Sequence, residues 1–277
     1  MNTSDNPRAL VLRTAGTNCD GETVRALEQA GAEVELLHLR RLIDDPSPLA
    51  RSAVLVLPGG FSYGDDVAAG RVLGLELRHH LGAALGEFVA AGGFVLGICN
   101  GFQVLVESGL LDAPCDSDTA AESGPPRGPR RMALTDNASA RFECRWVHLR
   151  SEASACPWLV PGEIWPVPVA HAEGRFTVAD PQTLAALRAG GQLALTYVNP
   201  DGSPPDYPAD PNGSAGHVAG VCDTTGRVLG LMPHPERNLQ SWNHPQWTRL
   251  TGDRTSGEGL LFWQRLVRAA AALPIGS

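Results

Sequence analysis

The sequence predicts an α/β fold, in which a central, mostly parallel sheet is flanked by helices and extended by a mixed β segment. Two observations carry this prediction. Up to residue 111, short apolar runs of strand length alternate with longer segments whose apolar residues recur at helical spacing, which is typical of parallel sheets with helices on both faces. From residue 142 onwards the runs become shorter and β-like, with little helical periodicity between them.

The individual elements follow from these patterns in chain order. Helices in the first half end at glycines, as at Gly31 and at the pair Gly92-Gly93. This half is expected to contain strands at 9–13, 34–39, 53–57 and 94–98 and helices at 20–30, 71–91 and 102–111. The second half is expected to contain strands at 144–149, 164–169, 193–198, 218–221 and 228–231 and an amphipathic helix at 258–273.

A single domain, residues 1–277, is expected because the second half shows no core of its own. Residues 8–111 form its parallel βα half and 136–277 its mixed β half. Between them, residues 112–135 are expected to form a flexible loop, since 114–131 is rich in Pro, Gly, Ser and Asp and has almost nothing to bury. Ligands of such sheets gather at the carboxyl ends of the parallel strands, so functional residues are expected there.

Composition excludes several classes of function. Hydrophobic residues make up 43% of the chain, and the net charge of -8 argues against nucleic acid or an anionic membrane as a partner. No apolar run reaches transmembrane length, and the polar first eight residues lack the apolar region of a signal peptide. The six cysteines are scattered without a CxxC pair. We therefore expect a cytoplasmic protein with reduced cysteines.

The stretch Gly97-Ile98-Cys99-Asn100-Gly101 is the strongest chemical signal in the chain. A buried strand leads into it and a helix-permissive segment follows, which is the pattern of a nucleophile elbow. In so tight a turn, side chains at 97 and 101 would collide with neighbouring backbone, so glycine is required. Cys99 would project from the N-terminus of a helix, where the helix dipole favours a negative charge. The alternative is a buried, inert cysteine, which would need no flanking glycines.

A thiol nucleophile needs a base, and His234 is the best candidate. It ends an expected strand, stands between Pro233 and Pro235, and has Glu236 two residues further on. In an extended segment Glu236 would lie on the same face as His234 and orient its far ring nitrogen. A cysteine, a histidine and a carboxylate make the nucleophile, base and orienting group of acyl transfer. The alternative is a proline-rich turn with a surface histidine.

Gly59, Gly60 and Phe61 follow the third expected strand and are candidates for binding an oxyanion or glutamine, because the glycines leave backbone N–H groups bare. With the N–H of Asn100 these would form an oxyanion hole, in which each donor can contribute about 3 kcal/mol of transition-state stabilisation. Glycines after a strand occur in any tight turn, so this assignment depends on Cys99. No His and Cys residues have the paired spacing of metal ligands, and we predict no metal site.

Together these motifs resemble those of class I (triad-type) glutamine amidotransferases, which have a flavodoxin-like fold. The similarity extends over nearly the whole chain and is closest to the family of glutaminase subunits of phosphoribosylformylglycinamidine synthase. The blocks at 59–65 and 170–176 narrow it to this family. The matching blocks are Gly16-Thr17-Asn18-Cys19-Asp20, 59–65, 97–103, 137–146, 170–176, 212–214 and 230–237.

The resemblance implies a glutamine-hydrolysing enzyme, the amidohydrolase half of an ATP-dependent C–N ligase of purine biosynthesis. Cys99 would attack the side-chain amide of glutamine and form a glutamyl thioester. His234 would donate a proton to the leaving ammonia and later activate water, with Glu236 holding the imidazole. The oxyanion would be bound by the N–H groups described above, and Gln103 would help to hold glutamine.

Ammonia would pass to a large synthetase subunit, with a small bridging subunit as a further candidate partner. ATP and Mg²⁺ would belong to the synthetase, because this chain carries no phosphate-binding loop and would bind no cofactor itself. The resemblance also implies a docking surface, for which His171, Glu173 and Arg175 are the candidates, with a solvated turn as the alternative. Two rival functions are an amidotransferase serving another acceptor and a non-catalytic regulatory relative.

Overall fold

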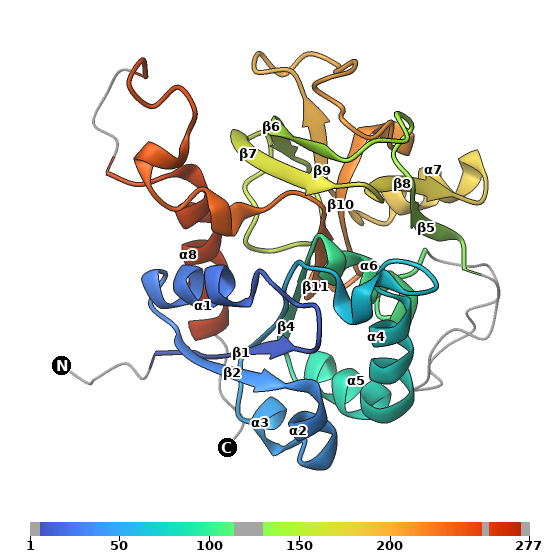
Figure 1. Cartoon of the computed structure of the whole chain (residues 1–277), viewed down its shortest axis with the longest axis vertical. Helices are drawn as coiled ribbons and strands as arrows, with labels where there is room; N and C mark the ends of the chain where they lie inside the picture. The colour runs from blue at the N-terminus through green and yellow to red at the C-terminus, as the bar shows by residue number, and fades with distance from the viewer. Residues whose placement is uncertain (1–5, 114–129, 251–254, 273–277) are drawn as a thin grey trace.

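The computed structural model describes residues 6–113, 130–250 and 255–272. Its centre is a nine-stranded sheet with the strand order β2-β1-β3-β4-β11-β10-β9-β6-β7 (Figure 1). The first five strands in this order pair in parallel, and the last four join them in antiparallel pairs. The predicted fold class, a mostly parallel sheet with a mixed β extension, is therefore confirmed.

The strands of this sheet lie within two residues of their predicted bounds. The parallel part consists of β1 (Arg8–Arg13), β2 (Glu33–His38), β3 (Val54–Leu57), β4 (Phe94–Ile98) and β11 (Val228–Leu231). The antiparallel part consists of β6 (Glu143–Ser151), β7 (Ile164–His171), β9 (Leu193–Val198) and β10 (Val218–Cys222).

Helices cover both faces of the parallel part. On one face, α1 (Asp20–Gln29) packs on β1 and β2 and against α8 (Glu258–Ala271), whereas α4 (Arg71–Glu76), α5 (Gly82–Ala90) and α6 (Asn100–Ser108) lie on the other (Figure 1). A π-helical turn, Leu77–Leu81, joins α4 to α5, so the long helix expected over 71–91 is present with one wider turn. The sequence pattern does not reveal α2 (Leu39–Asp44), α3 (Ser47–Ala50) or α7 (Pro181–Ala189).

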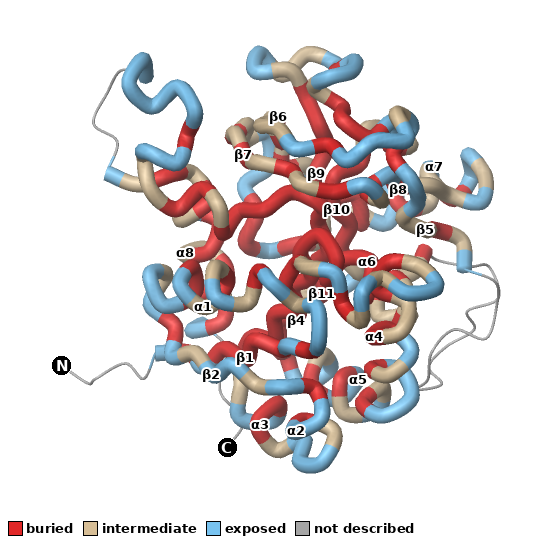
Figure 2. The backbone as a smooth tube through the Cα atoms, in the orientation of Figure 1, coloured by how far each residue is buried: buried red, intermediate tan, exposed pale blue. Residues whose placement is uncertain are grey.

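The central strands are buried on both faces, as Figure 2 shows for the middle of the sheet. Every residue of β3, β4 and β11 is buried, which explains why these strands appear in the sequence as continuous apolar runs. The edge strand β2 has no buried residue. The residues that follow the central strands are therefore anchored by closely packed backbone.

One part of the expected flexible loop is ordered, so the prediction for 112–135 is wrong there. Met132–Thr135 forms β5, which pairs antiparallel with β8 (Arg175–Val178) in a second, two-stranded sheet. Met132 is buried, and pairing with β8 satisfies backbone groups in a way that a four-residue pattern does not reveal. Within the rest of that prediction, residues 114–129 lie outside the described residues.

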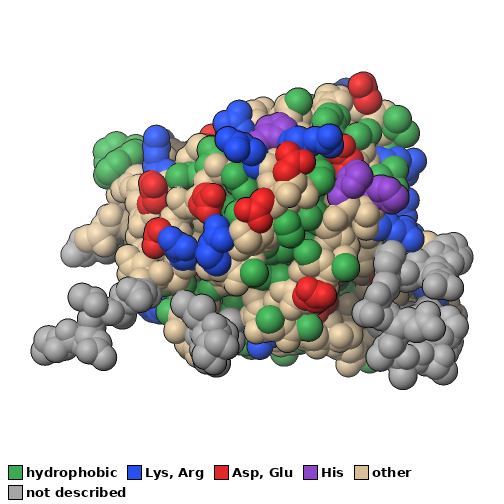
Figure 3. All heavy atoms as spheres, turned by 90° about the horizontal axis from the view of Figure 1, so that it is seen from below, with side chains coloured by type: hydrophobic (Ala, Val, Ile, Leu, Met, Phe, Trp, Pro, Cys, Tyr) green, Lys and Arg blue, Asp and Glu red, His purple; other side chains and the backbone are tan. Residues whose placement is uncertain are grey.

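The surface carries charges of both signs. The chain has no lysine, and on the described part of the face in Figure 3 Arg side chains are interspersed with Asp and Glu side chains. None of the helices in the described ranges has the length and apolar character needed to cross a bilayer.

Gly101 provides a test of the packing between β3 and α6. A Cβ atom at this position would lie 1.9 Å from the carbonyl oxygen of Leu57, a backbone atom in a buried strand. We expect Gly101→Ala to lower the free energy of unfolding by about 3 kcal/mol or more. As a matched control, Gly86 in α5 has no atom within 4 Å of an added Cβ. Gly86→Ala should stabilise the protein by about 0.5–1 kcal/mol.

Denaturant unfolding of the two variants and the wild type measures both effects. Equal stabilities of Gly101→Ala and Gly86→Ala would contradict the close approach of β3 and α6.

Candidate active site

Cys99 lies at the junction of β4 and α6, where the sequence predicts a nucleophile elbow. Its backbone has φ 52° and ψ -108°, a conformation that costs a non-glycine residue about 1–3 kcal/mol. The flanking glycines are needed, because a Cβ on Gly97 would lie 2.5 Å from the carbonyl oxygen of Gly101. The Cys99 thiol donates to the carbonyl oxygen of Ala170 at 3.7 Å. A strained turn thus places Cys99 in the lining of a cavity, where a nucleophile can meet a substrate.

His234 and Glu236 follow β11 and form a buried pair. Nδ1 of His234 lies 2.6 Å from Oε1 of Glu236, and the two side chains are 2% and 0% exposed. The extended segment expected here is wrong, because Pro235–Arg237 forms a 3₁₀ turn. This tight turn brings the carboxylate back to the imidazole, so the predicted pair forms through a different backbone geometry.

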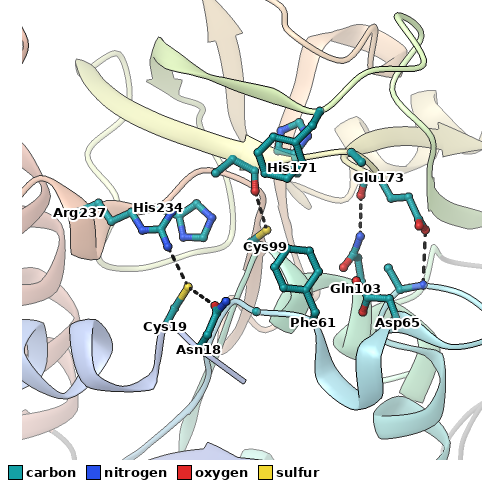
Figure 4. Close-up of a pocket in the computed structure, with 15 residues that line it drawn as sticks. Asn18, Cys19, Phe61, Asp65, Cys99, Gln103, His171, Glu173, His234 and Arg237 are labelled. Carbon is teal, nitrogen blue, oxygen red and sulfur yellow. Dashed lines mark hydrogen bonds between the residues drawn. The ribbon is translucent and has the colours of Figure 1, made fainter. Parts of the chain in front are cut away.

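The imidazole of His234 is held with one nitrogen free. Because β4 and β11 are adjacent and parallel, Cys99 and His234 lie at the same edge of the sheet (Figure 4). Nε2 of His234 is buried and has no hydrogen-bond partner among the described residues. Burial opposes the charged imidazole, but the charges of Glu236 and Cys99 outweigh it, and the pKa of His234 is raised well above its ordinary value. His234 is therefore suited to hold a proton and to transfer it from Nε2.

A cavity of about 200 Å³ opens beside these residues. Cys99 lies in the middle of its floor in Figure 4, with His234 to one side and Gln103 and Asp65 to the other. Burial, followed by the nearby charge of Glu173, raises the pKa of Asp65. The cavity thus places a nucleophile and a base at one end and acidic groups at the other.

Two backbone N–H groups near Cys99 are available for an oxyanion. Neither Gly60 nor Asn100 donates its amide hydrogen to another described residue, and Gly60 has φ +146°, which favours glycine. The N–H of Phe61 donates to the carbonyl oxygen of Gly16 at 2.9 Å, so of the two predicted roles of Phe61 only contact with glutamine stays a prediction. Its half-exposed side chain forms a wall of the cavity instead. Gly59 packs against the imidazole, since an added Cβ would lie 2.9 Å from Cε1 of His234.

The side chains of Asn100 and Gln103 brace the cavity. Asn100 accepts from the N–H of Ser62 at 3.1 Å and donates to Oε1 of Gln103 at 3.0 Å. Gln103 in turn donates to the carbonyl oxygen of Glu173 at 2.6 Å. This chain of bonds ties α6 to the two loops on either side, so Gln103 shapes the cavity and keeps one N–H for a ligand.

The three candidates for docking, His171, Glu173 and Arg175, differ in their exposure and contacts. His171 is 4% exposed and its Nδ1 bonds to Oδ1 of Asn137, while burial lowers its pKa to about 4. His171 as a docking residue is therefore wrong, because the imidazole lines the cavity. Glu173 is partly buried, and its carboxylate accepts from the N–H of Ala69 at 3.4 Å. Arg175 is exposed and bonds to the carbonyl oxygen of Gly213.

Two further cavity residues, Cys19 and Arg237, received no role from the sequence pattern. Cys19 lies beyond the carboxyl end of β1, so the rule that located Cys99 applies to it as well. Arg237 directly follows Glu236, and only the fold shows that its guanidinium reaches back to the cavity. Its Nη2 donates to the Cys19 sulfur at 3.1 Å.

Cys19, His234 and Glu236 are close enough to bind a metal ion, but other interactions already account for their arrangement. A sulfur of Cys19, a ring nitrogen of His234 and a carboxylate oxygen of Glu236 lie within 4.8 Å of one another. Glu236 is already bonded to the imidazole, and Arg237 puts a positive charge beside the sulfur. A divalent cation would be repelled by that charge, so the absence of a metal here stays our prediction.

Fold and site together define the class of this protein as a glutamine amidotransferase. A family model of the CobB/CobQ-like glutamine amidotransferase domain matches residues 6–272. The phosphoribosylformylglycinamidine synthase subunit PurQ of Dehalococcoides mccartyi is 40% identical over 267 residues, which cover 95% of this chain and 97% of the relative. The same subunit of Treponema denticola is 44% identical over 240 residues, covering 84% and 88%.

A solved structure of PurLQS from Thermotoga maritima is also similar, with a TM-score of 0.67 and 29% identity over 96% of this chain and 97% of the matched chain. These similarities cover nearly the full length of the relatives. The chain therefore belongs to the PurQ family of phosphoribosylformylglycinamidine synthase subunits, and the family resemblance inferred from the motifs is confirmed.

The raised pKa of His234 predicts a pH-dependent effect of removing Glu236. Because this pKa is higher in the folded than in the unfolded protein, the charged imidazole contributes stability that is fully present below about pH 6.5 and is lost as the pH rises through the folded pKa. Glu236→Gln removes the carboxylate that supports the charge. In thermal unfolding, we expect the variant to lose more melting temperature at about pH 6 than at about pH 9. An equal loss at both would contradict the assignment.

Proposed function

We propose that this chain is the glutaminase subunit of phosphoribosylformylglycinamidine synthase, which hydrolyses glutamine and delivers ammonia to a synthetase partner. The observation that carries the proposal is the convergence of Cys99, His234 and Glu236 at one edge of the sheet, in a chain of the PurQ family. The partner uses the ammonia and ATP to convert formylglycinamide ribonucleotide to formylglycinamidine ribonucleotide in purine biosynthesis.

The first half of the reaction forms a thioester. Nε2 of His234 already holds the proton of Cys99, because the pKa of the imidazole is raised, and the thiolate of Cys99 attacks the side-chain amide carbon of glutamine. The carbonyl electron pair moves onto oxygen, which is stabilised by the N–H groups of Gly60 and Asn100. When the intermediate collapses, the C–N bond breaks, and His234 returns the proton to the leaving ammonia.

The second half releases glutamate. His234 takes a proton from water, the resulting hydroxide attacks the thioester, and the C–S bond breaks to regenerate Cys99. Glu236 holds Nδ1 throughout, so that Nε2 stays directed to the reacting atoms and the imidazolium is stabilised each time it forms.

The acidic end of the cavity suits the α-ammonium group of glutamine. Asp65 and Glu173 lie across Cys99 from His234 (Figure 4), and the negative charge of Glu173 adds to burial in raising the pKa of Asp65. The α-ammonium group of glutamine, placed between them, would relieve that repulsion. The side-chain amide would then extend toward Cys99.

The ATP chemistry belongs to the partner. We propose that ATP and Mg²⁺ are bound by the synthetase subunit, that a small subunit completes the complex, and that this assembly works in the cytoplasm. The similarity to a chain of PurLQS supports both partners. Free ammonia would be lost to water as ammonium, so the reaction is useful only when the subunits are joined.

Substitution of Cys99 tests the proposed function. We expect Cys99→Ala to abolish glutamine-dependent synthesis by the reconstituted complex and to leave ammonia-dependent synthesis unchanged, because the thiol acts only in releasing ammonia. Product formation with each nitrogen source measures this. Retention of normal glutaminase activity would rule out Cys99 as the nucleophile.

Arg175 tests the coupling to the partner. We expect the isolated chain to hydrolyse glutamine slowly and the substrate-loaded synthetase to raise kcat, since a misplaced oxyanion donor can cost about 10²–10³-fold. Arg175→Ala should weaken this stimulation without changing the basal rate. Glutamate release is measured with and without the partner, using Arg188→Ala on an exposed position of α7 as the control. Equal rates with and without partner would reject both gating and docking at Arg175.

A further inference from the structure

Cys19 and Arg237 form a bonded unit beside the triad that the proposed reaction does not use. Nη2 of Arg237 donates to the Cys19 sulfur at 3.1 Å, and its Nε donates to Oε2 of Glu22 at 2.9 Å. Glu22 lies on α1, whereas Arg237 ends the 3₁₀ turn that carries Glu236. One guanidinium therefore connects the turn of the triad to a helix from the start of the chain.

The Cys19 sulfur lies against the imidazole of His234. Potential donor and acceptor atoms of these two residues are within 4.8 Å of each other. A Cβ added to Gly59 would meet Cε1 of His234 at 2.9 Å, the Cys19 sulfur at 3.2 Å and Cβ of Cys99 at 3.4 Å. All three groups thus pack over one glycine, and Figure 4 shows His234 between Cys99 and the Cys19–Arg237 pair.

We propose that Cys19 and Arg237 are positioning residues of the triad. Arg237, anchored on Glu22, holds the Cys19 sulfur beside His234, and the sulfur fixes the orientation of the imidazole toward Cys99. This inference rests on the proposed glutaminase function of the same site.

A second contact is needed because the bond to Glu236 alone still lets the imidazole of His234 tilt. A single bond at Nδ1 fixes one point of the ring, while the ring can still tilt about that point because Nε2 has no partner among the described residues. A polarisable sulfur packed against the ring removes this tilt. Reacting groups must be held within fractions of an ångström, and a misplacement of about 1 Å can cost 10²-fold in rate. Arg237 is in turn kept from swinging into the cavity by its bond to Glu22.

The test uses Cys19→Ala, Arg237→Gln and the double variant, each in the reconstituted complex. We expect each single variant to lower kcat for glutamine at least about 10-fold with KM within about two-fold, because the imidazole and not the substrate is misplaced. The double variant should be no worse than the singles, since the two residues act as one unit. Cys19→Ser, which keeps a small polar atom, should recover part of kcat.

A second readout does not depend on turnover. We expect iodoacetamide to label Cys99 more slowly in Arg237→Gln than in the wild type, as measured by mass spectrometry of the Cys99 peptide, because a tilted imidazole supports the thiolate less well. Arg8→Gln, which removes an exposed surface pair with Glu33, is the matched control and should change neither readout. Circular dichroism of each variant and its co-purification with the synthetase verify that it folds and assembles.

The outcomes separate the two proposals. If the wild type fails to release glutamate from glutamine, the proposed function fails. The positioning role alone is overturned if the wild type is active and any of three results is found. The single variants raise KM at unchanged kcat, the double variant loses as much kcat as the product of the two single losses, or Cys99 is labelled at the wild-type rate.

Discussion

The parallel pairing of β4 with β11 is the constraint on which the site depends. Gly97 lies opposite Gly230 and Ile98 opposite Leu231, and the N–H of Cys99 donates to the carbonyl oxygen of Leu231 at 2.8 Å. This register brings Cys99, the proposed nucleophile from the first half of the chain, to the strand that leads to His234 in the second half. Both strands are buried throughout, so the register cannot slip without moving apolar residues out of the core.

Close packing around that pair determines the rest of the geometry. A Cβ on Gly230 would lie 2.1 Å from the ring of Phe102, so α6 rests directly on β11. The positive φ of Cys99 persists because strands and helix fix the backbone on both sides of it. Gly59 is also close to the imidazole of His234, because a Cβ atom in its place would lie 2.9 Å from Cε1. Close packing thus fixes the backbone of the site, so that the hydrogen-bond donors and acceptors around Cys99 are preorganised for a ligand.

The sequence predicts this part of the fold and site, because apolar periodicity identifies the strands and chemically reactive residues follow directly after them. The parallel half, the elbow at Cys99 and the pair of His234 with Glu236 all follow from local pattern combined with the rule that ligands gather at the carboxyl ends of parallel strands. Sequence-based prediction fails where long-range packing decides: β5 pairs with β8 and packs on α6, and the N–H of Phe61 is bonded to a carbonyl group that lies far from it in sequence. His171 is buried for the same reason, since the cavity wall is made by the end of a strand from the antiparallel half.

The cavity contains two thiols near one imidazole, and we propose that Cys99 alone carries the covalent chemistry. Cys99 has the strained backbone and the two free N–H groups beside it, whereas the sulfur of Cys19 is engaged by Arg237. The most direct test is to quench the synthetase-bound protein with acid during turnover of glutamine and to locate the glutamyl group by peptide mass spectrometry. We expect a glutamyl thioester on the peptide that contains Cys99. A glutamyl group on Cys19, or turnover with no adduct on Cys99, would contradict it.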